Sequence, residues 1–196
     1  MFSDRHEAGR RLAAALADLR GSGGVVLGLA RGGVPVAAEV AAALGLPLDV
    51  LVVRKLGHPR DPELGVGALA EEDVVLHDER ALAMLGVGPE SLAAVEDAER
   101  AELARRVRRY RGARPPRDLR GRTAIIVDDG IATGGTARAA VEAVRRRGAA
   151  DVVLAVPVGP SRVGSAYADF RQTDDAEVLA LLVRRPTPAR TPGGGR

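Results

Sequence analysis

The chain has 196 residues, a formal net charge of +3 and 46% hydrophobic residues, which suits one domain with a sizeable core. Aromatic residues make up only 2%, so no series of exposed rings is available to stack nucleic-acid bases, and the small net charge also argues against nucleic acid as a partner. The absence of cysteine excludes disulfides and thiolate metal sites and fits a cytoplasmic protein. No apolar run reaches membrane-spanning length, and the polar N-terminus is unlike a signal peptide.

The first half of the chain alternates helical and apolar segments. The pattern predicts a helix over 4–20, a strand over 25–29, a helix over 34–44 and a strand over 48–53. Continuous apolar strands separated by helices predict a parallel sheet that is covered on both faces. Residues 66–69 and 74–76 predict a hairpin across Glu71 and Glu72, within a small flap of about residues 57–88.

The second half continues the same alternation. It predicts a helix over 89–110, a strand over 123–127, a helix over 136–147 and a strand over 152–156. Asp174 and Glu177 form a capping-box pattern for a last helix through Val183. Residues 1–184 are therefore expected to form one domain, followed by a disordered tail over 185–196, rich in Pro, Gly and Arg. The arginines of 105–111 are expected on a solvated helix face, with a lid or a dimer contact as the alternatives.

The loop after the strand over 123–127 carries the strongest functional signal. This strand delivers Asp128 and Asp129 to the carboxyl edge of the sheet, where open α/β sheets bind ligands. Small residues over 130–136 then lead into a helix, so that backbone amides, Thr133 and Thr136 can bind a phosphate. The carboxylates can accept hydrogen bonds from ribose hydroxyls or support hydrated Mg²⁺. A sugar that carries a phosphate satisfies both halves of the motif.

Other interpretations of this loop are simpler or use a different motif. The same pattern also fits a strand, turn and helix with acidic turn residues and no ligand. A P-loop would require a lysine after the glycines, and a dinucleotide site would require G-x-G-x-x-G after the first strand; the sequence has neither.

The segment 124–136 resembles the signature of type I phosphoribosyltransferases, which bind 5-phosphoribosyl 1-pyrophosphate (PRPP). The resemblance extends over nearly the whole chain and implies a doubly wound, mostly parallel α/β sheet with a small flap. It also implies that Asp128 and Asp129 hold the ribose hydroxyls and, through water, Mg²⁺. The residues implied to hold the 5′-phosphate are Ala132, Thr133, Gly134, Gly135 and Thr136.

A second loop, after the strand over 25–29, resembles the pyrophosphate loop of the same family. It contains Arg31, Gly32 and Gly33, and the resemblance implies a cis peptide bond between Ala30 and Arg31. Lys55 is expected at the end of the second strand, on the same edge of the sheet, where the resemblance implies a role toward pyrophosphate.

The resemblance implies an Mg²⁺-dependent transferase that moves ribose 5-phosphate from PRPP to a nitrogenous base and releases pyrophosphate. Arg31, Lys55, Asp128 and Asp129 are the expected catalytic residues. Two alternatives stay open: a non-catalytic PRPP sensor, and an inactive remnant. The remnant is suggested by the short segment after Pro160, which has no room for the crossover to a further parallel strand. We therefore expect the strand over 152–156 at the edge of a four-stranded core, either pairing in a homodimer or covered by residues 161–183.

Overall fold

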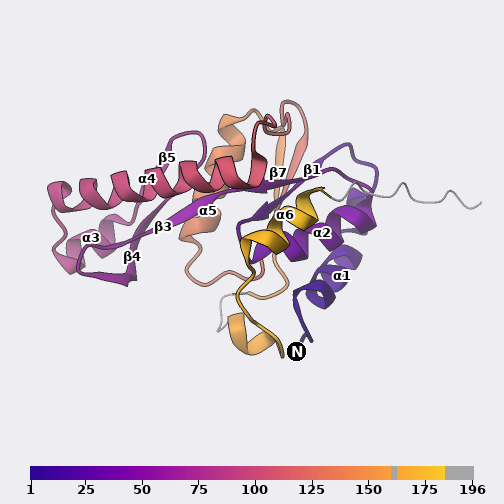
Figure 1. The fold of residues 1–196 in the computed structure, drawn as a ribbon, viewed down its shortest axis with the longest axis horizontal. Coiled ribbons are helices and arrows are strands. Elements are labelled where there is room, and N and C mark those ends of the chain that lie inside the picture. The colour runs from indigo at the N-terminus through magenta and orange to yellow at the C-terminus, as the bar shows by residue number, and fades with distance from the viewer. Residues whose placement is uncertain (160–162, 184–196) are drawn as a thin grey trace, which may run out of the picture.

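The computed structural model describes residues 1–159 and 163–183, so the tail predicted over 185–196 lies outside the described residues. A four-stranded parallel sheet has the order β2-β1-β6-β7, and a three-stranded antiparallel sheet has the order β3-β4-β5 (Figure 1). The strands are β1 (Val25–Leu29), β2 (Leu48–Leu51), β3 (Val53–His58), β4 (Asp61–Ala70), β5 (Val74–His77), β6 (Thr123–Val127) and β7 (Asp151–Ala155). The helices are α1 (Arg5–Ala15), α2 (Gly33–Leu44), α3 (Glu79–Leu85), α4 (Pro89–Arg111), α5 (Gly135–Arg146) and α6 (Asp175–Val183), with short 3₁₀ turns at Ala17–Leu19 and Val163–Ala166.

Helices cover both faces of the parallel sheet, as the continuous apolar strands predicted. Val26 of β1 and Ile125 of β6 are partners in the ladder and pack with α1 and α2 on one face. Leu27 and Ile126, one residue further along each strand, pack with α5 on the other face. This alternation within fully buried strands makes the fold a doubly wound α/β sheet.

The prediction of one strand over 48–53 is wrong, because this apolar run contributes residues to two different sheets. β2 ends at Leu51, and β3 begins at Val53 in the antiparallel sheet. Glu71 stabilises this change of sheet, because its Oε1 accepts a hydrogen bond of 2.9 Å from the amide of Val52. Arg111, at the end of α4, donates in turn to Glu71 at 2.8 Å and is only 5% exposed. The prediction that the arginines of 105–111 lie on a solvated face is therefore wrong for Arg111.

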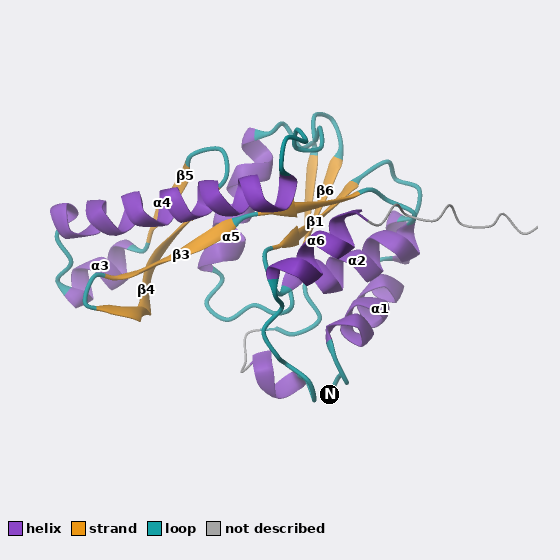
Figure 2. Cartoon of the chain, viewed as in Figure 1, coloured by secondary structure: helices purple, strands orange, loops and turns teal. Residues whose placement is uncertain are grey.

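The antiparallel sheet and α4 form an arm beside the parallel sheet. Figure 2 shows the long helix α4 running along β3, β4 and β5, with α3 near the end of the arm. The hairpin between β4 and β5 confirms the predicted flap strands, although β4 is longer than expected and pairs on its other side with β3. Helix α3 was not predicted. Two pairs fix α4 to the sheet: Arg54 with Glu99 at 2.6 Å and His77 with Glu96 at 2.6 Å.

Strand β7 lies at the edge of the parallel sheet, which confirms the predicted four-stranded core. Among the described residues it pairs with β6 alone, and Leu154 is 38% exposed. No parallel strand follows it within 163–183. Helix α6, capped by Asp174 as predicted, packs on α2, α4 and β2 at the opposite side of the sheet. The helical part of residues 161–183, predicted as one alternative cover of the β7 edge, therefore does not cover it.

Within the described residues no helix is long and apolar enough to cross a bilayer. The carboxyl ends of β1 and β6 lie side by side in the centre of the sheet, because these strands are parallel neighbours. The loop that leads into α2 and the loop that leads into α5 therefore open on the same edge.

Candidate active site

Two adjacent carboxylates follow β6 directly. The amide of Asp129 donates to Oδ1 of Asp128 at 2.9 Å, and the amide of Asp128 donates to the carbonyl of Ala155 at 3.4 Å. Burial and the neighbouring charge of Asp129 raise the pKa of Asp128 to about 7. Two carboxylates this close together in a partly desolvated loop favour a ligand that donates hydrogen bonds or carries positive charge.

The loop after β1 packs directly on this acid pair. A Cβ atom on Gly32 would lie 2.2 Å from Oδ2 of Asp129, and one on Gly33 would lie 2.5 Å from the carbonyl oxygen of Val127. Only glycine permits these approaches without displacement of the acid pair. The peptide bond between Ala30 and Arg31 is cis.

The side chain of Arg31 is 25% exposed and faces the first residue of α6. Its Nη1 lies 4.0 Å from Oδ1 of Asp175, which accepts a hydrogen bond of 2.6 Å from the hydroxyl of Tyr110. Arg109 contacts the other oxygen of Asp175 at 2.6 Å. Asp175 thus lies near the Arg31 guanidinium, at a distance too long for a hydrogen bond.

The segment 130–136 forms an open cradle at the start of α5. Gly134 has a φ of +80°, which favours glycine, and directs the chain into the helix at Gly135. A Cβ atom on Gly135 would have no neighbour within 4 Å, and Gly134, Gly135 and Thr136 all line a cavity, so the start of the helix is open. Amides at a helix N-terminus attract anions.

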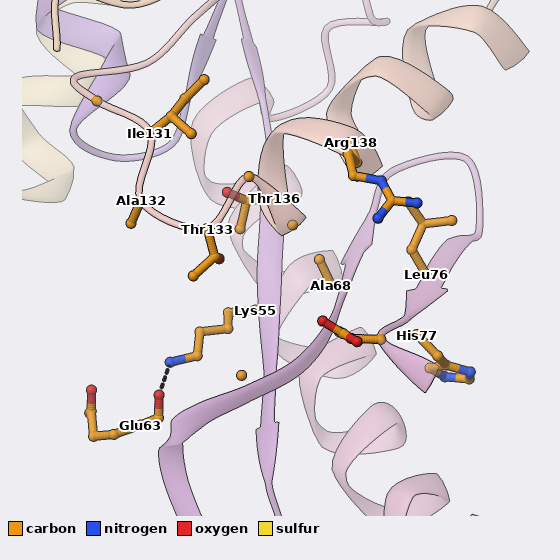
Figure 3. A pocket seen from close by; sticks show the side chains of 16 residues that line it. Lys55, Glu63, Ala68, Leu76, His77, Ile131, Ala132, Thr133, Thr136 and Arg138 are labelled. Atoms are coloured by element: carbon orange, nitrogen blue, oxygen red, sulfur yellow. Dashed lines mark hydrogen bonds between the residues drawn. The ribbon is translucent and has the colours of Figure 1, made fainter. Parts of the chain in front are cut away.

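This cradle is one wall of a cavity of about 400 Å³, and the antiparallel sheet is the other (Figure 3). Thr133 and Thr136 line it from the loop side, Lys55 lines it from β3, and Arg138 reaches it from the first turns of α5. Two cations and two hydroxyls beside a helix N-terminus suit a phosphate group.

Lys55 lies elsewhere than predicted, because β3 belongs to the antiparallel sheet. Its ammonium donates to the carbonyl of Glu63 and shares the cavity with Thr133, instead of ending a strand beside Arg31. The structure therefore brings Gly32 and Gly33 together with Asp128 and Asp129, and Lys55 together with residues 132–136. The side chain of Arg31 lies apart from both groups and faces Asp175.

Sequence reasoning missed two residues that contact the acid pair or its loop, and a third that packs against both of them. Arg5 of α1 makes two contacts of 2.8 Å with Oδ2 of Asp129, and the hydroxyl of Tyr167 donates to the carbonyl of Asp129 at 2.6 Å. Phe170 stacks on Tyr167. No local pattern distinguishes Arg5 from the many other arginines of this chain, in which Lys55 is the single lysine. The aromatic residues were a usable signal, since Phe2, Tyr167 and Phe170 are three of only four in the chain.

The acid pair has a donor set that suits a hydrated Mg²⁺ ion. Mg²⁺ keeps several waters and binds proteins through one or two carboxylates together with substrate phosphates. Asp128 and Asp129 supply two carboxylates beside the loop after β1 that contains Gly32 and Gly33, called here the pyrophosphate-type loop. Residues 1–159 and 163–183 contain no group of three His, Asp or Glu that would hold an ion alone.

Fold and site together define an α/β protein with a candidate ligand site at the carboxyl edge of a doubly wound sheet. A family profile described as a phosphoribosyl transferase domain matches residues 3–175, and the chain belongs to this family.

Related chains agree with this assignment. A Mycobacterium tuberculosis protein provisionally named a phosphoribosyl transferase is 47% identical over 94% of this chain and 47% of its own length. The chain thus spans about half the length of that relative. The crystal structure of TT1426 from Thermus thermophilus is 36% identical, with a TM-score of 0.74 over 93% of this chain and 98% of that one. A uracil phosphoribosyltransferase from Lactobacillus delbrueckii is 38% identical over a shorter stretch, 34% of this chain and 32% of that protein.

Proposed function

We propose that this protein is an Mg²⁺-dependent phosphoribosyltransferase, which transfers ribose 5-phosphate from PRPP to a nitrogenous base and releases pyrophosphate. One observation carries the proposal: Gly32 of the pyrophosphate-type loop is in contact with Asp129 of the acid pair. A ribose on the acid pair would therefore carry its C1 pyrophosphate toward the amides of the first loop. Its 5′-phosphate would extend toward the cradle at the start of α5.

The proposed roles follow from the chemistry of glycosyl transfer. Departure of pyrophosphate builds positive charge on the ribose ring, which needs electrostatic stabilisation more than it needs a protein nucleophile. Asp128 and Asp129 orient the ribose, while Arg31, Gly32 and Gly33 bind the leaving pyrophosphate. Mg²⁺, held through water by the acid pair, would neutralise charge on the leaving group. The residues proposed for the 5′-phosphate are Ala132, Thr133, Gly134, Gly135 and Thr136, with Lys55 opposite them in the same cavity.

The second candidate is a PRPP sensor or an inactive remnant. It is favoured by the edge position of β7, after which no further strand is present in the described part of the chain. A missing strand removes one wall on which an acceptor base would rest. PRPP binding does not depend on that wall.

One experiment separates these candidates. The protein is mixed with Mg²⁺ and PRPP, purines, pyrimidines and related bases are added in turn, and released pyrophosphate is measured. Base-dependent release supports the transferase. Calorimetric binding of Mg²⁺-PRPP without release for any base supports the sensor or remnant, and no binding at all contradicts both.

Variants test the proposed division of the site. Asn at both Asp128 and Asp129 should weaken PRPP binding, because each charge-assisted hydrogen bond contributes roughly 1.5–3 kcal/mol. Gly134→Val should weaken ribose 5-phosphate binding, since its side chain would be strained at a φ of +80°. Arg31→Ala should weaken PRPP binding much more than ribose 5-phosphate binding. Equal effects of the last two variants on both ligands would contradict separate phosphate subsites.

We further propose a homodimer that pairs through the edge of β7 and resides in the cytoplasm. Support for the dimer comes from Leu154, which is 38% exposed on a strand whose outer edge has no partner among the described residues. The proposed partners are thus PRPP, a small-molecule base and a second copy of the chain, with neither nucleic acid nor a membrane.

A further inference from the structure

Arg5 is held in one orientation by contacts on three sides. Its Nε and Nη2 each lie 2.8 Å from Oδ2 of Asp129, and Nη1 donates to the carbonyl of Arg171 at 2.7 Å. The guanidinium carbon lies 4.1 Å from the ring centroid of Phe170. Arg5 is 11% exposed and Asp129 is 16% exposed, so water screens this pair little.

These contacts involve segments that are far apart in the sequence. Helix α1 provides Arg5, the loop after β6 provides Asp129, and the segment before α6 provides Phe170 and the carbonyl of Arg171. The same segment contacts Asp129 again through the Tyr167 hydroxyl, which donates to its backbone carbonyl. Both the side chain and the backbone of Asp129 are therefore fixed from outside its own loop.

The hydrogen bonds divide the oxygens of the acid pair into two sets. Oδ2 of Asp129 is engaged by Arg5, and Oδ1 of Asp128 is engaged by the amide of Asp129. Within 1–159 and 163–183, no hydrogen bond reaches Oδ1 of Asp129 or Oδ2 of Asp128. Arg5 thus engages one oxygen of the Asp129 carboxylate and leaves its Oδ1 without a donor among these residues.

We infer that Arg5 is a positioning residue, which holds Oδ2 of Asp129 so that Oδ1 is presented to the 2-hydroxyl of the ribose. The inference rests on the proposed function, because it assigns the ligand of the acid pair. A fork of two guanidinium nitrogens at one carboxylate oxygen, with a hydrogen bond from Nε, fixes direction as well as charge, which a lysine would not do. Phe170 acts one step further away, since it fixes the plane of the guanidinium.

The test is a cycle that combines a variant with a change in the ligand. Ribose 5-phosphate and 2-deoxyribose 5-phosphate differ by one hydroxyl, and their affinities are measured by calorimetry for each protein. Wild type should prefer ribose 5-phosphate. Arg5→Gln should weaken ribose 5-phosphate binding about tenfold or more, the value for a charge-assisted hydrogen bond, and reduce the preference between the two sugars. A purely structural effect would weaken both sugars equally.

Three further variants accompany the cycle. Arg5→Lys keeps the charge without the fork and should recover only part of the preference. Phe170→Leu should reduce the preference less than Arg5→Gln does, and both variants carry the test if Arg5→Gln does not fold. Arg11→Gln is the matched control, because Arg11 also lies on α1 over a ring, 5.3 Å from the centroid of Phe2, but pairs with Glu7 away from the acid pair. It should behave as wild type.

Each other outcome has a defined meaning. Variants at Arg5 that keep the full preference for ribose 5-phosphate would overturn the inference. Tighter binding by Arg5→Gln would also overturn it, because Arg5 would then be a competitor for the carboxylate. A wild-type protein that binds neither sugar phosphate nor PRPP would instead overturn the proposed function, and this inference with it.

Discussion

Replacement of Gly33 by alanine tests how closely the two loops of the site are packed. Gly33 is the first residue of α2, and a Cβ atom there would lie 2.5 Å from the carbonyl oxygen of Val127 and 2.8 Å from Cα of Asp128. Both are backbone atoms, so no side-chain rotation relieves the clash. Overpacking costs roughly 1–3 kcal/mol, whereas the helix propensity of alanine over glycine recovers at most about 1 kcal/mol. We therefore expect the free energy of unfolding to fall by about 1–2 kcal/mol.

Gly135→Ala provides the matched control, because Gly135 is the first residue of α5 and its Cβ would have no neighbour within 4 Å. This variant should be neutral or slightly more stable. Thermal unfolding followed by circular dichroism, without ligand, measures both. A loss of about 1–2 kcal/mol lowers the Tm of a domain of this size by roughly 2–8 °C. If Gly33→Ala melted at the same temperature as Gly135→Ala, the close packing of the two loops would be refuted.

Three other predictions concern the arm, the acid pair and the sheet edge. Arg111→Met should lower the free energy of unfolding in urea by about 3–5 kcal/mol, because it leaves Glu71 as a buried charge without its partner; Arg105→Ala, at an exposed ion pair, should cost less than about 1 kcal/mol. Because the pKa of Asp128 is raised from 3.8 to about 7 on folding, wild type should lose stability as the pH rises through that interval. Asp128→Asn should remove this loss, so its free energy of unfolding should rise relative to that of wild type as the pH increases. A difference between the two proteins that stays constant with pH would contradict the raised pKa. Leu154→Lys should shift the sedimentation equilibrium of the protein toward monomer, and an unchanged equilibrium would exclude the β7 edge as the interface.

The sequence predicted those parts of the fold that have a strong local pattern. Strands β1 and β6 begin and end where expected, because each is a short apolar run between a glycine-containing turn and polar loop residues. Helix α6 begins after Asp174, whose side chain accepts from the amide of Glu177 at 2.8 Å, as the capping box predicted. These signals depend only on neighbouring residues.

Features that depend on distant contacts were not predictable in this way. The change of sheet at Val52 lies inside a continuous apolar run, because both β2 and the start of β3 are buried. It is fixed by Glu71 and Arg111, which are distant in the sequence. Arg5 reaches Asp129 only after α1 has packed on α2, an approach in which a Cβ on Gly9 would lie 2.7 Å from the carbonyl oxygen of Val36.

The short segment after β7 has a second consequence for the site. Since it adds no strand within the described residues, the chain returns across the carboxyl edge of the sheet to reach α6. On this path Tyr167 contacts the loop of Asp129, and Asp175 then lies beside Arg31 on the other loop. The same segment therefore supports both loops that are proposed to bind PRPP. Because this segment supports both loops and adds no strand within the described residues, we expect the proposed PRPP site to be better formed than the acceptor side.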